Sequence, residues 1–234
     1  LAIINCNIFN ATIRQLNVTG AAIGVSLSNN TAGSFTVMGD GGGANNGSGG
    51  TINTSTGDGV FLNAVNNISL GYMNISNSGD NGINGTTVNN FALTRANIAN
   101  NGNSVTDEGV KLTTVTGTVT IANTSVTGSA HNNVFIDNAI GTLNNLTISG
   151  STFATNSGTT GNHGILIDIS GSAIVTAGTI TNSTFSSNRS IGLQVVAGDT
   201  ATISMVTVSN SLFNTTTAQV QQISMDLSKS ETSN

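Results

Sequence analysis

Two aspartates are the side chains best placed to do chemistry in this sequence. Asp137 and Asp168 each end a short apolar strand pattern, Val-Phe-Ile-Asp and Ile-Leu-Ile-Asp. If these strands are neighbours, the two carboxylates lie about 5 Å apart, because adjacent strands are about 4.8 Å apart. That spacing suits a retaining glycosidase pair or shared ligation of Ca²⁺. The alternative is two exposed acids that tolerate each other in water.

Large side chains occupy the position two residues before these aspartates. Phe135 and Leu166 stand there, and Phe61 and Lys111 hold the equivalent place in other copies of the pattern. Alternation along a strand turns this position outward. Exposed aromatic rings suit stacking on sugars or docking against another protein. The alternative is a loop, such as residues 197–200, that folds over them.

Other reactive residues give weaker signals. His131 and His163 precede two successive strand patterns, but neither has a third ligand at a spacing typical of a metal site, so we interpret them as surface turn residues. Cys6 is the only cysteine, which excludes an internal disulfide, and we expect it to be a buried apolar residue.

A glycine-rich segment, Gly39 to Gly50, is the longest insertion in the chain. No helix pattern or GK[ST] motif follows it, so it does not read as a phosphate-binding loop. We predict a flexible surface loop between a second and a third strand, with Asp40 as a weak Ca²⁺ ligand at most.

Composition excludes several classes of partner. Charged residues make up 6% of the 234 residues, and five Lys and Arg face ten Asp and Glu. Such a chain lacks the basic surface that a phosphate backbone requires, so we expect no nucleic-acid partner. No apolar run approaches the roughly 18 residues that span a bilayer, and no signal peptide is visible, so we expect no direct membrane insertion. Hydrophobic residues reach 37%, which indicates a folded chain.

Internal repeats position all of these residues. A block of Gly, apolar, variable, apolar recurs about every 23 to 35 residues, and single Asn or Gly replacements give degenerate copies. Because Asn133 replaces the glycine in one copy, we expect positive φ at this position. The blocks begin at Gly24, Gly59, Gly82, Gly109, Asn133, Gly164 and Gly192.

Two further apolar patterns follow each block. A second alternation, such as Ile68/Leu70 or Leu146/Ile148, is followed by a third apolar position within a polar frame, such as Ile75 or Phe185. Three short strands per repeat predict one all-β domain of about eight stacked three-strand coils over residues 1–227. Residues 228–234 then form a polar tail or the start of another coil. Equivalent positions stack in successive coils, so we expect an internal aromatic stack of Phe153, Phe185 and Phe213.

The repeats resemble those of the pectate-lyase-like superfamily of right-handed, single-stranded parallel β-helices. The resemblance rests on the Gly blocks and on polar corners such as Asn182-Ser183-Thr184-Phe185 and Met73-Asn74-Ile75-Ser76-Asn77, and it runs from about Ala2 to Leu227. The low-charge, proline-free style is most similar to the passenger regions of bacterial surface adhesins and autotransporters. Enzymes of the superfamily need clustered carboxylates with basic residues, which is hard to assemble from the basic residues present, Arg14, Arg95, Lys111, Arg189 and Lys229.

We therefore favour a non-enzymatic structural or adhesive solenoid module of a large secreted or cell-surface protein or filament, without catalytic residues or a required cofactor. The expected partners are copies of itself, neighbouring solenoid segments or glycans. The alternative is a polysaccharide-binding or polysaccharide-degrading β-helix. An ice-binding solenoid is disfavoured by the unequal coil lengths. Strand-like sequence at both ends suggests a segment of a longer rod. The candidate ligand-binding residues are Phe61, Lys111, Phe135, Asp137, Leu166 and Asp168, of which Asp137 and Asp168 are the candidate Ca²⁺ ligands.

Overall fold

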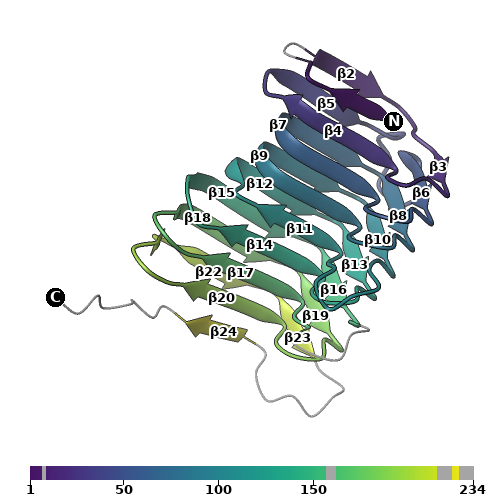
Figure 1. Cartoon of the computed structure of the whole chain (residues 1–234). Coiled ribbons are helices and arrows are strands. Elements are labelled where there is room, and N and C mark those ends of the chain that lie inside the picture. The colour runs from purple at the N-terminus through teal and green to yellow at the C-terminus, as the bar shows by residue number, and fades with distance from the viewer. Residues whose placement is uncertain (7–8, 157–161, 215–222, 227–234) are drawn as a thin grey trace.

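The chain folds as a parallel β-solenoid, which confirms the all-β fold expected from the repeats. The computed structural model describes residues 1–6, 9–156, 162–214 and 223–226, and these ranges contain strands but no helix. Figure 1 shows the strands stacked in order along one rod, from the N-terminal end to the C-terminal end. The predicted tail at 228–234 lies outside the described residues.

The first face of the solenoid is built from the strands of the Gly blocks. They pair in parallel through backbone hydrogen bonds, each with the strand one coil away. The strands are β1 (Ala2–Ile4), β4 (Val25–Asn30), β7 (Val60–Gly71), β9 (Ile83–Thr94), β11 (Val110–Thr113), β14 (Val134–Asn138), β17 (Ile165–Ile169), β20 (Leu193–Ala197) and β24 (Ile223–Asp226).

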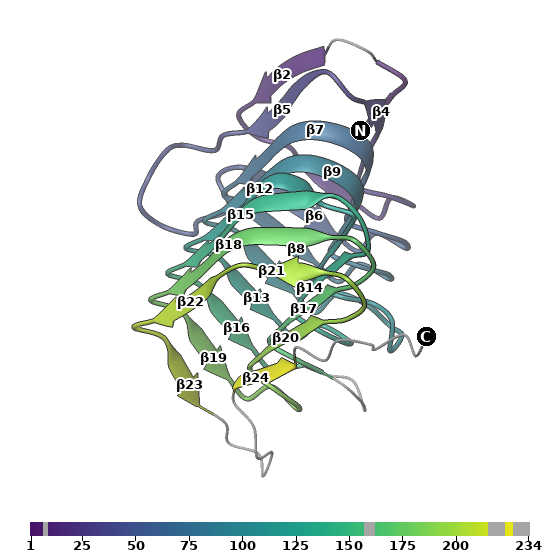
Figure 2. The same ribbon diagram turned by 90° about the vertical axis from the view of Figure 1, so that its left-hand side faces the viewer.

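The second face follows the same stacking, with one difference from the predicted pattern. β7 and β9 continue from the first face into the second without a break, and Figure 2 shows both bending round the corner. Asn67 and Asn90 have positive φ at this bend, a conformation that Asn adopts at low cost. The other strands are β2 (Phe9–Ile13), β5 (Gly33–Val37), β12 (Thr116–Ala122), β15 (Thr142–Ser149), β18 (Ile174–Thr181), β21 (Thr202–Ile203) and β22 (Val206–Ser209).

The third face is a separate parallel sheet of eight strands. Eight strands are separated by seven steps, so the described chain makes about seven turns between the first strand of this sheet and the last, close to the expected eight coils. We number the coils one to eight by these strands. They are β3 (Val18–Thr19), β6 (Gly50–Asn53), β8 (Met73–Ser76), β10 (Asn97–Ala99), β13 (Ser125–Thr127), β16 (Thr152–Ala154), β19 (Thr184–Ser186) and β23 (Leu212–Asn214).

Side chains that point inward form one continuous apolar core. Buried and partly exposed residues alternate along the strands, as in Val110-Lys111-Leu112-Thr113, because successive side chains point to opposite faces of a sheet. The predicted aromatic stack is confirmed, with ring centroids 5.3 Å apart for Phe153 and Phe185 and 4.5 Å apart for Phe185 and Phe213. Each coil therefore buries its apolar row against its neighbours.

The repeated glycine serves a purpose other than the positive φ that we expected. Five of the six block glycines, Gly24, Gly59, Gly82, Gly109 and Gly164, do not have positive φ. A Cβ on Gly59 would instead lie 2.6 Å from the carbonyl oxygen of Gly82 in the next coil, and the other four show the same close approach. The glycines are required because the backbones of successive coils meet there.

The glycine-rich loop joins β5 to β6, as predicted, and it is held against the solenoid. Asp40 accepts hydrogen bonds from the Gly42 N–H at 2.9 Å and from Asn46 at 2.7 Å. Tyr72 donates to the Gly42 carbonyl at 2.7 Å, and Asn45 donates to the Asn123 carbonyl at 2.7 Å. The loop thus crosses from coil two to coil five along one corner. These donors hold the pKa of Asp40 below its usual value, the Gly42 N–H having the largest effect.

Candidate functional site

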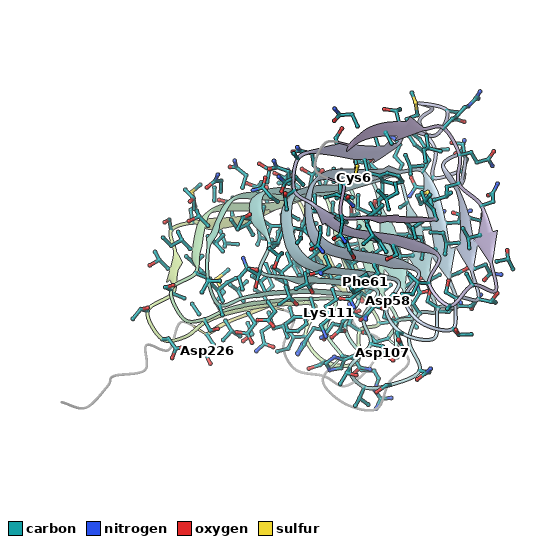
Figure 3. All side chains as sticks on the ribbon, turned by 45° about the horizontal axis from the view of Figure 1, so that its top comes forward. Cys6, Asp58, Phe61, Asp107, Lys111 and Asp226 are labelled. Carbon is teal, nitrogen blue, oxygen red and sulfur yellow. The ribbon has the colours of Figure 1, made fainter. Side chains whose placement is uncertain are left out.

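The outward side of the first face carries the candidate residues in two adjacent columns. In the first column Phe135 lies between Lys111 and Leu166 in the strand register. Phe61 is further away, because Asn84 separates it from Lys111. Figure 3 shows Phe61 and Lys111 on one side of the solenoid. All four candidate side chains are half-buried. Lys111, Phe135 and Leu166 therefore form one group, and Phe61 stands apart from it.

The second column holds the aspartates in the predicted arrangement. Asp137 and Asp168 are register partners on β14 and β17. Burial, and then the neighbouring Asp137 carboxylate, raise the pKa of Asp168 above its ordinary value. Val196 follows in the next coil and Asp226 in the one after. The column gathers negative charge without a basic side chain in register with it.

The segment at residues 197–200 lies on the turn of the coil before it. Gly198 N–H donates to the Ile169 carbonyl, and the Asp199 carboxylate accepts from Gly171 N–H at 3.1 Å. This segment therefore does not fold over the outward apolar residues, and that alternative is wrong for residues 197–200. The loop continues the corner of the solenoid instead.

A second set of chemically capable residues lines the buried corner directly before the first face. Each side chain in this column accepts a hydrogen bond from the backbone N–H of the next residue in the column, one coil further on. We call this column the corner ladder, and it consists of Asp58, Asn81, Glu108, Asn132, His163 and the backbone N–H of Ile191. The five donor–acceptor distances, from Asn81 N–H to Asp58 through to Ile191 N–H to His163 Nδ1, are 3.1, 2.8, 2.6, 2.9 and 3.3 Å.

Glu108 and the two histidines form the most highly connected part of the corner ladder. Glu108 is 2% exposed, and its second carboxylate oxygen lies 3.0 Å from His131 Nδ1. The two histidines are offset by one residue, because His163 shares its column with Asn132. Burial, and then the neighbouring His131, lower the pKa of His163 to about 4. Both histidines lie in turns, as expected, but they are half-buried and bonded within the corner instead of standing free at the surface.

Sequence reasoning missed the corner ladder although a signal for it was present. A polar residue directly precedes five of the repeated blocks, in Asp58-Gly59, Asn81-Gly82, Glu108-Gly109, Asn132-Asn133 and His163-Gly164. The residue types differ, and what they share is an acceptor atom that reaches the next coil. Hydroxyl groups form a similar column before the third face, with the bonds in the opposite direction along the chain. Ser151, Ser183 and Ser211 accept from the backbone N–H groups of Thr124, Ser151 and Ser183 in the preceding coil.

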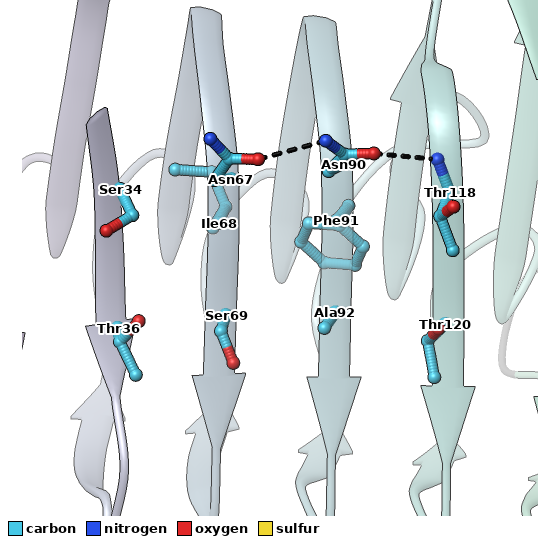
Figure 4. Close-up of a pocket in the computed structure, with 10 residues that line it drawn as sticks. All are labelled: Ser34, Thr36, Asn67, Ile68, Ser69, Asn90, Phe91, Ala92, Thr118 and Thr120. Atoms are coloured by element: carbon cyan, nitrogen blue, oxygen red, sulfur yellow. Dashed lines mark hydrogen bonds between the residues drawn. The ribbon is translucent and has the colours of Figure 1, made fainter. Parts of the chain in front are cut away.

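The outward side of the second face contains a shallow hollow of about 330 Å³ over β5, β7, β9 and β12. Figure 4 shows a short chain of hydrogen bonds across this hollow. Asn90 donates its side-chain N–H to the Asn67 side-chain oxygen and accepts from the Thr118 N–H. Hydroxyl groups of Ser34, Thr36 and Thr120 also line it, and Ile68 and Phe91 lie beneath. No ionisable side chain lines this hollow. Its lining suits an uncharged, hydroxyl-bearing ligand.

Among the residues that the structure describes, no three His, Cys, Asp or Glu side chains come together to hold a metal ion. The Ca²⁺ site at Asp137 and Asp168 stays a prediction. Cys6 is partly exposed instead of buried. Over the described ranges no helix has the length and apolar character to cross a membrane. The chain matches no protein-family model, no curated protein and no solved structure.

Proposed function

We propose that this chain is a non-enzymatic structural module, a stiff spacer that presents an adhesive or self-associating face. The observation that carries the proposal is the corner ladder. Its acids and imidazole are side-chain types capable of acid–base catalysis, yet they are used to couple each coil to the next. A solenoid converts chain length into reach at about 4.8 Å per coil.

The setting that we propose is the surface of a cell or an extracellular filament, with copies of the chain or neighbouring solenoid segments as partners. The resemblance of the repeats to passenger regions of bacterial adhesins and autotransporters supports it. Low charge supports it as well, because an outward face rich in Ser, Thr and Asn docks against a copy of itself with little electrostatic repulsion.

Sedimentation velocity over a range of concentrations tests self-association. We expect the sedimentation coefficient to rise with concentration and the double variant Asn63→Glu/Thr113→Glu to stay monomeric, because it places like charges on the outward first face of both copies. Ser125→Glu, on the third face, is the matched control and should associate like the original chain. A protein that stays monomeric at every concentration, and does not clump when coupled to beads, contradicts the proposal.

Glycan binding is a second candidate, supported by the uncharged hollow and by Phe135 and Leu166 beside Lys111, Asp137 and Asp168. Incubation with a panel of neutral and uronate glycans distinguishes the two functions. Loss of binding or cleavage in Asp168→Asn would favour the outward first face. Loss in Ser69→Phe, which fills the hollow, would favour the second face. If no glycan of the panel is bound or cleaved, glycan binding is excluded for this panel and the structural function is favoured.

A further inference from the structure

The corner ladder ends in the one member whose acceptor atom disappears when it takes up a proton. Amide oxygens at Asn81 and Asn132 accept without titrating, and a protonated carboxyl group at Asp58 or Glu108 keeps one carbonyl oxygen as acceptor. At His163, Nδ1 accepts from the Ile191 N–H at 3.3 Å. An imidazolium has a proton on both ring nitrogens and accepts nothing. The step from coil seven to coil eight therefore requires a neutral His163.

The surroundings of His163 also oppose a positive charge. The ring is mostly enclosed, and the neighbouring His131 in coil six lowers the pKa of His163 further. Glu108 in coil five contacts His131 at 3.0 Å, so its negative charge lies beside His131. On the other side, coil eight contributes the Ile191 backbone and carries Arg189 two residues earlier. The neighbouring His131 therefore disfavours the imidazolium.

We propose that His163 makes the corner ladder an acid-sensitive clasp, in which its protonation in mildly acidic solution releases the Ile191 N–H of coil eight from coil seven and loosens the segment around it. Once the segment at Ile191 opens, His163 is exposed to water and titrates as an ordinary histidine near pH 6.5. The open form therefore binds the proton more tightly than the closed form. Closure is stable above pH 6.5 and weakens as the pH falls toward 4.

The opening is local because the strands of coils seven and eight remain paired elsewhere. β17 pairs with β20 from Ile165 to Ile169, and β19 pairs with β23. Loss of the clasp frays the start of β20 first, since Ile191 lies two residues before that strand. A frayed β20 exposes the edge of β17, which can then pair with a strand of another copy. Acid thus controls access to a strand edge, independently of the self-association face proposed above.

Hydrogen exchange at the Ile191 amide tests the clasp. The full difference in proton affinity would raise the opening constant about twentyfold between pH 7 and pH 5, and water around the half-buried ring reduces this to about tenfold. We expect that increase, after correction for intrinsic exchange rates, in the original chain. The matched variant is His163→Asn, because Asn already serves the corner ladder at positions 81 and 132. It should keep the Ile191 amide protected with less than about a twofold change.

A titration of the His163 ring by NMR in the original chain provides the second, independent measurement. A midpoint below pH 5 supports the clasp, whether or not the variant is stable enough for exchange measurements. A midpoint near pH 6.5 overturns it. Equal loss of protection at Ile191 in the original chain and in His163→Asn also overturns it, because the acid effect then arises elsewhere.

Discussion

His163 and Asp168 lie five residues apart in the same coil, His163 just before β17 and Asp168 near the end of that strand. Burial shifts the pKa values of the two side chains in opposite directions. Burial lowers the pKa of His163 and raises the pKa of Asp168. Both shifts favour the neutral form, because removing a charge from water is costly. The histidine belongs to a buried column whose members bond to one another, whereas Asp168 belongs to an outward column in which Asp137 repels it.

This contrast shows that position relative to the repeated glycine decides what a polar residue does. A residue directly before the glycine faces the neighbouring coil and stabilises it through a backbone hydrogen bond. A residue four positions after the glycine faces outward and is free to meet a ligand. A carboxyl side chain is therefore structural at Glu108, whereas at Asp168 it is a candidate binding group.

The largest expected difference between inward and outward columns is for phenylalanine. Phe185→Ala removes the middle ring of the aromatic stack and should lower the free energy of unfolding by about 3–5 kcal/mol, because a cavity remains between Phe153 and Phe213. Phe135→Ala, on the outward first face, should cost about 1 kcal/mol or less. Urea denaturation measures both, and equal losses would contradict the distinction between the two columns.

Within the corner ladder, Glu108 should show the next largest effect. Glu108→Ala leaves the Asn132 N–H and His131 without their acceptor and should cost about 2–4 kcal/mol, since a buried unpaired donor is expensive. Glu108→Gln keeps one acceptor oxygen and should cost about 1 kcal/mol. A comparison of thermal unfolding at pH 7 measures the difference. If the two variants are equally unstable, the charge of Glu108 matters more than its hydrogen bonds.

The smallest effect is a gain in stability. The raised pKa of Asp168 means that the folded state disfavours its ionised form, so the wild-type chain loses stability as the pH rises through that pKa. Asp168→Asn should therefore stabilise the protein by about 0.5 kcal/mol at pH 7, a small value because the group is largely in water, and by nothing at pH 3. Thr86→Asn, in the same column, is the uncharged control. A loss of stability that occurs only with Ca²⁺ present would instead support the predicted cation site.

The sequence predicted the coil and its core because both depend on local periodicity. The Gly blocks and the apolar positions identified three strands per coil, and a column of Phe residues predicted the aromatic stack. The predicted role of the block glycine, a positive φ, was wrong. It was inferred from Asn133, a residue type that adopts positive φ easily. The structure instead shows the backbone of the next coil 2.6 Å from where a Cβ on Gly109 would lie.

The candidate site was predictable only in part, for a related reason. Alternation placed Asp137 and Asp168 in one outward column, since a strand pattern fixes the face. The corner ladder escaped because its members differ in type, and the bond that unites them joins each side chain to a backbone N–H in another coil. Such a bond depends on the register between coils, and a residue-by-residue comparison of the repeats does not reveal it.

The glycine-rich loop has a mechanical consequence. It leaves coil two, receives the Tyr72 hydroxyl of coil three, and reaches the carbonyls of Ala96 and Asn123 in coils four and five through Asn45. A rod pulled along its axis extends by separating coils one at a time, but here the loop shares the load among four of them. Tension would therefore detach the unbraced coils first and leave the braced coils two to five as the last part to unravel.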